Sequence, residues 1–311
     1  MSASQKLLWV FGGIVALLSV ASAVGWLLQQ RKGDTAVIRN LNERVRAWWL
    51  MVAVLGACFW AGAAATLIVF ALISFFALRE FITLTPTRAS DHKPLAIAFY
   101  VLVPLQYWLI HLGWYGLFSI FIPVYAFLAL PAIAVFAGDT EQFLERTTKI
   151  QWGVMIAVYC ISYAPALLVL DLRGFHGQGA LLLLYLMLVV QISDVMQYVF
   201  GKLFGRHKLA PLVSPSKTVE GLVGGGLAAT AIGASLWWIT PFTPPQSALM
   251  SLLIVACGVL GGLALSAVKR SLGAKDWGSM IEGHGGMMDR MDSVSFAAPI
   301  FFHITRFFFS G

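Results

Sequence analysis

The feature that most constrains this chain is a series of long apolar runs that occupy most of its 311 residues. They lie at 7–28, 46–80, 94–112, 114–137, 151–171, 180–200, 222–242, 247–268 and 294–309. An α-helix needs about 20 apolar residues to cross a bilayer, and most runs reach that length. Charged residues make up only 11% of the chain, whereas about a quarter is normal for a soluble domain. The sequence therefore predicts an all-α, polytopic transmembrane protein.

The run at 46–80 is too long for one span, and the charges around it show how to divide it. Both flanks, 29–45 and 79–93, are basic, and basic segments tend to stay in the cytoplasm. An even number of crossings must separate two cytoplasmic flanks, so we split the run into two short helices near Gly62. The chain then has about ten spans, with nine as the alternative.

The same charge rule predicts the side on which each connecting segment lies. It places 138–150, 201–221 and 269–293 in the cytoplasm, and the turns near His111, 173–179 and 243–245 outside. The net charge of +7 therefore reflects topology, and no pattern typical of nucleic-acid binding accompanies it. We expect an integral membrane protein, with a bacterial inner membrane as the favoured location and the site facing the cytoplasm.

The segment at 34–48 is amphipathic and leads into the second apolar run. Its apolar residues share one helical face: Val37, Ile38, Leu41, Val45 and Trp48. We interpret it as an interfacial helix. The chain is accordingly divided into an N-terminal membrane region at 1–93, which contains this helix, and a C-terminal membrane region at 94–311, which carries the candidate site.

The first apolar run and the cysteines have simple interpretations. The run at 7–28 is longer than the apolar core of a signal peptide, so we expect a retained span. Cys58, Cys160 and Cys257 lie inside apolar runs and are widely spaced. They are expected to be small buried side chains, with neither a disulfide framework nor a CxxC metal site.

A basic segment at 201–221 brings hydroxyl and ammonium groups together. Ser214, Ser216 and Thr218 surround Lys217; hydroxyls can donate to phosphate oxygens, and Lys217 supplies a compact positive charge. This order favours binding of a polyphosphate or a phospholipid head group, and a basic loop resting on anionic lipid is the alternative. Glu220 either caps the following helix or contacts a metal.

Asp194 interrupts the apolar run at 180–200. A carboxylate within a span is costly, and such residues usually face an interior polar site. The alternative is a residue near the helix end that reaches water. We therefore include Asp194 among the candidate site residues.

The segment at 269–292 concentrates charge between two apolar runs. Its glycines at 283–286 precede a predicted helix start near Met287, where backbone N–H groups and the helix N-terminus favour phosphate. Asp289 and Asp292 are three residues apart on one face, which suits hard-cation ligands. Three cations could neutralise a leaving pyrophosphate: Lys269, Arg270 and Lys275. A solvated charged loop is the alternative.

These motifs resemble the CDP-diacylglycerol synthases (phosphatidate cytidylyltransferases), most strongly over 189–296. The C-terminal signature of that family is matched by Ser266, Lys269, Arg270, Lys275, Asp276, His284, Gly285, Gly286, Asp289, Arg290 and Asp292, and its Ser-Pro-x-Lys-Thr motif by Ser214, Pro215, Lys217 and Thr218. Where the family usually has a metal-binding Asp after glycine, this chain has Gly262. Leu265, Glu282 and the sequence after Asp194 also depart from the pattern, which indicates a divergent branch.

The resemblance implies transfer of CMP from CTP to phosphatidate in the presence of Mg²⁺, with an added monovalent cation such as K⁺ left open. It implies catalytic roles for Lys217, Lys275, Asp276, His284 and Arg290; substrate binding by Ser214, Ser216, Thr218, Lys269, Arg270, Gly285 and Gly286; and metal binding by Asp289, with Asp194 and Asp292 in support. Alternatives are a transferase acting on another lipid phosphate, and a catalytically silent membrane protein or transporter. The expected partners are CTP, phosphatidate and membrane lipids, with no nucleic acid; a homodimer stays open.

Overall fold

The computed structural model describes residues 1–33, 35–280 and 285–310, and it shows an almost entirely helical chain. The first three helices are α1 (Ala3–Lys32), α2 (Ala36–Ala61) and α3 (Ala63–Leu84). The next two rods are each built from short consecutive pieces. They are η1 (Ala89–Asp91), α4 (His92–Ile97), η2 (Ala98–Leu102) and α5 (Val103–His111), followed by α6 (Tyr115–Ile120), η3 (Phe121–Ala126) and α7 (Phe127–Val135).

The second half of the chain contains the longest central helices. It runs through α8 (Phe143–Val154), η4 (Met155–Cys160), α9 (Ile161–Ala166), η5 (Leu167–Val169), α10 (Gly179–Phe204), η6 (Gly221–Gly225), α11 (Gly226–Ser235), η7 (Trp237–Ile239), α12 (Pro244–Ser271) and α13 (Met287–Phe309). Between α10 and η6, the strands β1 (Lys208–Ala210) and β2 (Ser214–Thr218) pair antiparallel. This hairpin is a small addition to the predicted all-α fold.

In the described parts of the chain, eight helices are long and apolar enough to cross a membrane. The split of the run at 46–80 is confirmed, because α2 ends at Ala61 and α3 begins at Ala63. Gly62 between them has φ +97°, a conformation that favours glycine. The remaining two predicted spans correspond to the shorter apolar helix Gly221–Ser235 and to α13, whose first turns are charged.

The predicted interfacial helix is not a separate element. The structure continues α2 from Ala36 to Ala61 without a break, so the amphipathic segment forms the first turns of a helix whose later part is apolar. The apolar face is consistent with this, since Ile38 and Val45 are buried. The predicted boundary was wrong because no helix-stopping residue separates the two parts.

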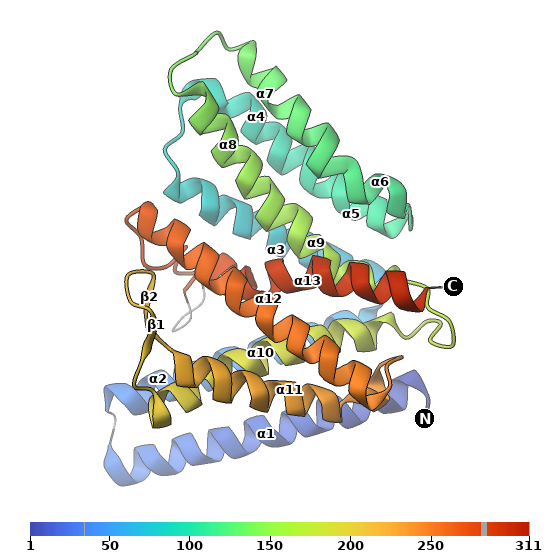
Figure 1. The fold of residues 1–311 in the computed structure, drawn as a ribbon, viewed down its shortest axis with the longest axis vertical. Coiled ribbons are helices and arrows are strands. Elements are labelled where there is room, and N and C mark those ends of the chain that lie inside the picture. The colour runs from blue at the N-terminus through green and yellow to red at the C-terminus, as the bar shows by residue number, and fades with distance from the viewer. Residues whose placement is uncertain (34, 281–284, 311) are drawn as a thin grey trace.

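One end of the helices carries the polar elements that matter for function. The β1–β2 hairpin and the last turn of α12 lie at this end, whereas both chain termini lie at the other (Figure 1). We call it the hairpin end. This arrangement agrees with the predicted topology, in which 201–221 and 269–293 face the same side.

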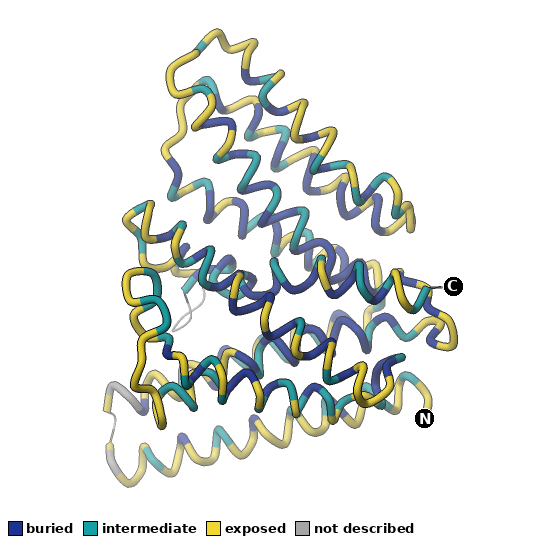
Figure 2. Tube along the Cα trace, viewed as in Figure 1, coloured by how far each residue is buried: buried dark blue, intermediate teal, exposed yellow. Residues whose placement is uncertain are grey.

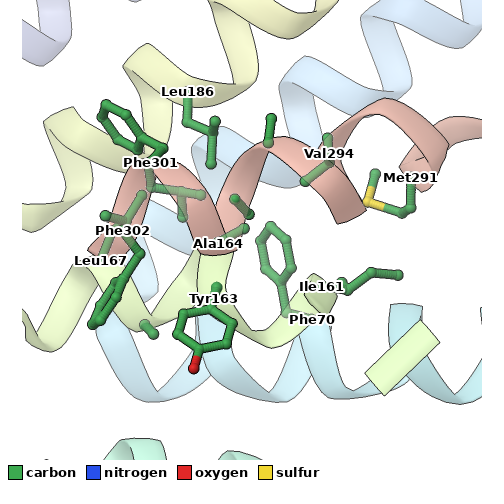
Figure 3. Packing of buried hydrophobic residues seen from close by; sticks show 14 of the residues in the cluster. Phe70, Ile161, Tyr163, Ala164, Leu167, Leu186, Met291, Val294, Phe301 and Phe302 are labelled. Atoms are coloured by element: carbon green, nitrogen blue, oxygen red, sulfur yellow. The ribbon is translucent and has the colours of Figure 1, made fainter. Parts of the chain in front are cut away.

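Helix α13 lies at the centre of the fold, and it packs against α3, α9, α10 and α12. Figure 3 shows Phe301 and Phe302 of α13 near Tyr163, Leu167 and Leu186 from the neighbouring helices. These side chains are almost completely buried. By contrast, α1 is largely exposed at the edge (Figure 2), as expected of a lipid-facing helix. The centre of the molecule therefore positions the first turns of α13.

A buried ion-pair network also stabilises the hairpin end of the α4–α8 region. Arg146 donates a hydrogen bond to Asp139, and its Nε lies 3.4 Å from Oδ1 of Asp91. Only 5% of the Arg146 side chain is exposed. Ser90 donates to Asp139 as well. The Arg146 guanidinium holds the pKa of Asp139 well below its usual range, at about 2, with help from Ser90. The network joins η1, which precedes α4, to the segment between α7 and α8.

Candidate functional site

Three elements meet at Gly262 of α12. A Cβ atom at this position would lie 3.1 Å from Lys217 Nζ of β2 and 4.0 Å from Asp292 Oδ2 of α13. The hydroxyl oxygen of Ser293 would be 3.6 Å away. Because position 262 has no side chain, the Lys217 ammonium can approach the carboxylate of Asp292 over the helix backbone.

Asp194 of α10 belongs to the same place. It is close enough to interact electrostatically with Lys217, Arg290 and Asp292. We call Asp194, Lys217, Arg290 and Asp292 the charge cluster. Asp194 is exposed and the other three members are half-buried. The cluster joins α10, β2 and α13, and it agrees with the prediction that Asp194 faces an interior polar site.

The cations of the charge cluster have unused donors. Neither Lys217 nor Arg290 forms an ion pair within 4.0 Å in the described part of the chain, and Arg290 Nε is buried there without a hydrogen-bond partner. Buried donors are normally satisfied, by protein, water or ligand. These two cations are therefore suited to bind an anion such as a phosphate.

Asp289 lies one turn before Asp292 but has different neighbours. Its Oδ1 accepts a hydrogen bond from Lys269 Nζ at 2.6 Å, and both side chains are less than a tenth exposed. Its Oδ2 accepts from the amides of Trp277 and Gly286, each at 2.9 Å. Both oxygens of Asp289 are thus engaged by protein groups, and its role as the leading metal ligand stays a prediction.

Glu80 of α3 is a residue that the sequence reasoning missed. Its carboxylate accepts hydrogen bonds from the amides of Met287, at 2.9 Å, and Met288, at 2.8 Å. Gly278 and Gly286 allow this contact, since a Cβ at either would come within 3.0 Å of the carboxylate. The one sequence signal was a carboxylate at the end of an apolar run. Its partner is more than 200 residues away and could not be identified.

The position of Glu80 also bears on the phosphate site predicted at the start of α13, which stays a prediction. The amides of Gly286, Met287 and Met288 already donate to Asp289 and Glu80. A helix N-terminus attracts anions because its N–H groups lack partners, and here protein carboxylates take those groups. Gly285 adopts φ +80°, a conformation that favours glycine, and its lack of a side chain leaves room for the Asp289 carboxylate. Gly286 leaves room for the Glu80 carboxylate.

The hairpin residues divide into structural and accessible ones. Thr218 is buried, and its hydroxyl oxygen accepts a hydrogen bond from the amide of Gly221, so it caps the next helix. Ser214 and Ser216 are half-buried and exposed, respectively. Glu220 neither caps that helix through its side chain nor joins the charge cluster. Its carboxylate accepts from the amide of Arg206, which with His207 lowers the Glu220 pKa to about 2.

The remaining predicted residues lie in the last turn of α12 and between α12 and α13. Arg270 donates to the carbonyl oxygens of Val213 and Ala274, so it connects this segment to the hairpin. Lys275 and Asp276 are exposed. His284 lies outside the described residues. The structure thus brings together the four members of the charge cluster. Lys269, Arg270 and Thr218 instead form contacts that hold the surrounding segments in place.

The chemistry of the charge cluster fits one hard cation. Mg²⁺ is usually held by one or two carboxylates together with substrate phosphates and water. Asp194 and Asp292 meet this requirement, because they lie near each other and neither forms an ion pair with a described residue. In the described ranges, no three His, Cys, Asp or Glu side chains gather into a complete metal site. Substrate oxygens would have to complete the coordination.

The fold and this cluster define a class: polytopic α-helical membrane proteins with a cluster of charged side chains at one end of the helices. The chain belongs to the cytidylyltransferase family, whose profile matches residues 42–308. It is 39% identical over 302 residues to uncharacterized protein YnbB of Escherichia coli (strain K12), covering 94% of this chain and 96% of the relative. The family resemblance found in the motifs is confirmed.

Other relatives match a smaller part of the chain. A phosphatidate cytidylyltransferase of Staphylococcus aureus (strain COL) is 34% identical over 158 residues. A phosphatidate cytidylyltransferase of Staphylococcus saprophyticus is 35% identical over 157 residues. In each case the match covers 49% of this chain and 60% of the relative. The near full-length likeness to YnbB and the partial likeness to these enzymes agree with a divergent branch.

Proposed function

We propose that this protein transfers the cytidylyl group of CTP to phosphatidate and releases pyrophosphate. The observation that carries the proposal is the charge cluster. Within the described residues none of its four members forms an ion pair within 4.0 Å, and its Lys217 and Asp292 lie beside the bare backbone of Gly262. CTP and phosphatidate are both anionic, so a site for them must offset repulsion and fix the two phosphates in place. Membership of the cytidylyltransferase family supports the same reaction class.

In the proposed reaction, an anionic oxygen of the lipid phosphate attacks the α-phosphorus of CTP. A new P–O bond forms as the bond to the β-phosphate oxygen breaks, and the electron pair leaves with pyrophosphate. No side chain has to remove a proton, because the attacking oxygen is already ionised at neutral pH. The work of the protein is therefore positioning and charge neutralisation.

The residues of the charge cluster divide this work between them. Lys217 and Arg290 bind the phosphates, and Lys217 can reach them because Gly262 leaves its ammonium uncovered. Asp194 and Asp292 would hold Mg²⁺, whose charge would offset that of the triphosphate. Lys269 and Asp289 act indirectly, as the ion pair that fixes the start of α13.

The proposal includes the location of the reaction. The hairpin end carries basic segments at 201–221 and 269–293, and basic segments favour the cytoplasmic side. We therefore place the site at the cytoplasmic face of a bacterial inner membrane, where CTP is present. The acceptor lipid would reach the site from the membrane.

The test uses detergent-solubilised protein with labelled CTP, Mg²⁺ and phosphatidate. Formation of labelled CDP-diacylglycerol with release of pyrophosphate, at a rate that Asp292→Asn lowers at a fixed Mg²⁺ concentration, is the expected result. Isoprenoid and ether-lipid phosphates form a parallel panel, and turnover with one of these alone would reassign the acceptor. Labelled product with none of the lipids, from protein that is folded and pure, would favour the silent or transport alternative.

A further inference from the structure

A polar stripe extends along α10 from the charge cluster toward the hairpin end. Asp194, Tyr198 and Lys202 are spaced four residues apart, so they follow one another along one side of the helix. All three are exposed. Each step of four residues advances about 6 Å along the helix axis. The stripe therefore connects Asp194 to the end of the helix through side chains that a ligand can reach.

Two cations from different helices meet at the middle of this stripe. The guanidinium carbon of Arg44 in α2 lies 5.7 Å from the centre of the Tyr198 ring, and Lys202 Nζ lies 5.8 Å from it. Within the described ranges, neither cation forms an ion pair with a carboxylate. The proposed catalysis leaves both unused. They form a positively charged pair beside Tyr198, which lies about one helical turn from Asp194.

An apolar stripe lies beside the cations on the same helix. Val195, Val199 and Leu203 are also spaced four apart, and their exposed fractions are 46%, 37% and 68%. Cations next to exposed apolar side chains match an amphiphile whose phosphate is attached to hydrocarbon chains. A nucleotide has no hydrocarbon chain that would pack on the apolar stripe. The combination of cations and apolar side chains therefore favours a lipid as the ligand.

We propose that Arg44, Tyr198 and Lys202 form a docking site for the phosphate group of the anionic lipid substrate. Its hydrocarbon chains lie along Val195, Val199 and Leu203, and the phosphate passes from the docking site to the charge cluster. This inference rests on the proposed function and names the route by which its lipid substrate arrives. The docking site is separate from Lys217 and Arg290, which bind the phosphates during transfer.

The first test measures binding, which does not depend on turnover. Purified wild-type protein and the double variant Arg44→Ala/Lys202→Ala are titrated with dioleoyl phosphatidate and with dioleoyl phosphatidylcholine, and bound lipid is counted by native mass spectrometry. We expect the double variant to bind phosphatidate about tenfold more weakly, as loss of charge-assisted contacts predicts, with phosphatidylcholine unchanged. The matched control is Arg79→Ala, which removes an exposed cation near the C-terminus of α3.

The outcomes separate the two proposals. Equal phosphatidate binding by the wild type and the double variant, or an equal loss in Arg79→Ala, would overturn the docking site. In the transfer assay, we expect the KM for phosphatidate to rise about tenfold while the KM for CTP and kcat stay unchanged. An active enzyme with unchanged lipid KM would refute the docking site alone. Absence of turnover in the wild type would refute the proposed function and leave the binding result to decide the docking site.

Discussion

At the scale of single residues, Asp289 and Asp292 lie three positions apart in α13 but face different groups. Asp289 is held by Lys269 and two amides, whereas Asp292 faces Lys217 and Asp194. Three residues correspond to 300° around a helix, so the two side chains diverge by about 60°. That divergence separates a residue that holds the local structure from one that faces the ligands.

Substitution of each aspartate should therefore have a different effect. We expect Asp292→Asn to raise the Mg²⁺ concentration needed for half-maximal turnover, with little change in stability. Asp289→Asn should instead lower the free energy of unfolding by about 3 kcal/mol, because it leaves the buried Lys269 without its ionised partner. Mg²⁺ titrations and thermal unfolding in detergent check both. A reversed pattern would return Asp289 to the metal site.

Lys217 gives a second prediction at this scale. It forms no ion pair in the described part of the chain, so its ammonium contributes more to ligand binding than to the fold. We expect Lys217→Gln to raise the KM for CTP at least about tenfold and to leave the unfolding temperature close to that of the wild type. Lys149→Gln, which removes a half-buried cation paired with Glu145, is the control. A large loss of stability with unchanged KM would refute the assignment.

At the scale of elements, Glu80 attaches the start of α13 to the end of α3. The variant Glu80→Ala leaves the amides of Met287 and Met288 without acceptors, and it should lower the free energy of unfolding by about 2 kcal/mol. Glu80→Gln retains one acceptor oxygen and should lose less. Hydrogen exchange at these two amides is the direct measurement. Exchange in Glu80→Ala as slow as in the wild type would contradict the cap, and Glu145→Gln serves as an exposed control.

The ion-pair network around Asp139 gives an element-scale prediction about pH. Hydrogen bonds from Arg146 and Ser90 lower the folded pKa of Asp139 to about 2, below the unfolded value of about 3.9. A lowered folded pKa stabilises the fold above the unfolded pKa, and this stabilisation is lost as the pH falls through the folded pKa. Stability should therefore decrease between about pH 4 and pH 2. The dependence should be weaker in Asp139→Asn, and identical acid profiles would contradict the prediction.

At the scale of the whole molecule, the basic segments at the hairpin end predict that this end faces the cytoplasm and that the other end faces the opposite side. The native cysteines are buried or half-buried. They should therefore react little with a thiol reagent, and labelling will report mainly on newly introduced cysteines. We expect Ser216→Cys at the hairpin end to react with an impermeant thiol reagent from the cytoplasmic side only. Arg173→Cys, in the turn before α10, should react only from the opposite side. Labelling of both from one side would overturn the topology.

The helices could be predicted from the sequence because membrane insertion depends on local composition. The division near Gly62 followed from the basic flanks on both sides of one apolar run. The motif residues Lys217 and Asp292 could also be found, since their chemistry is visible in short stretches. Contacts between distant segments were inaccessible in principle. Nothing near Glu80 indicates Met287, and nothing near Asp289 indicates that the amide of Trp277 satisfies it.

The contact between Glu80 and α13 has a consequence for how such a chain can be divided. The charged motifs lie late in the sequence, which invites the idea that the last third could be transplanted onto another set of helices. A graft lacking α3 would also lack the acceptor for the first amides of α13. Recombination between relatives should therefore succeed only where α3 and α13 are inherited together, or where the recipient offers its own carboxylate at that position.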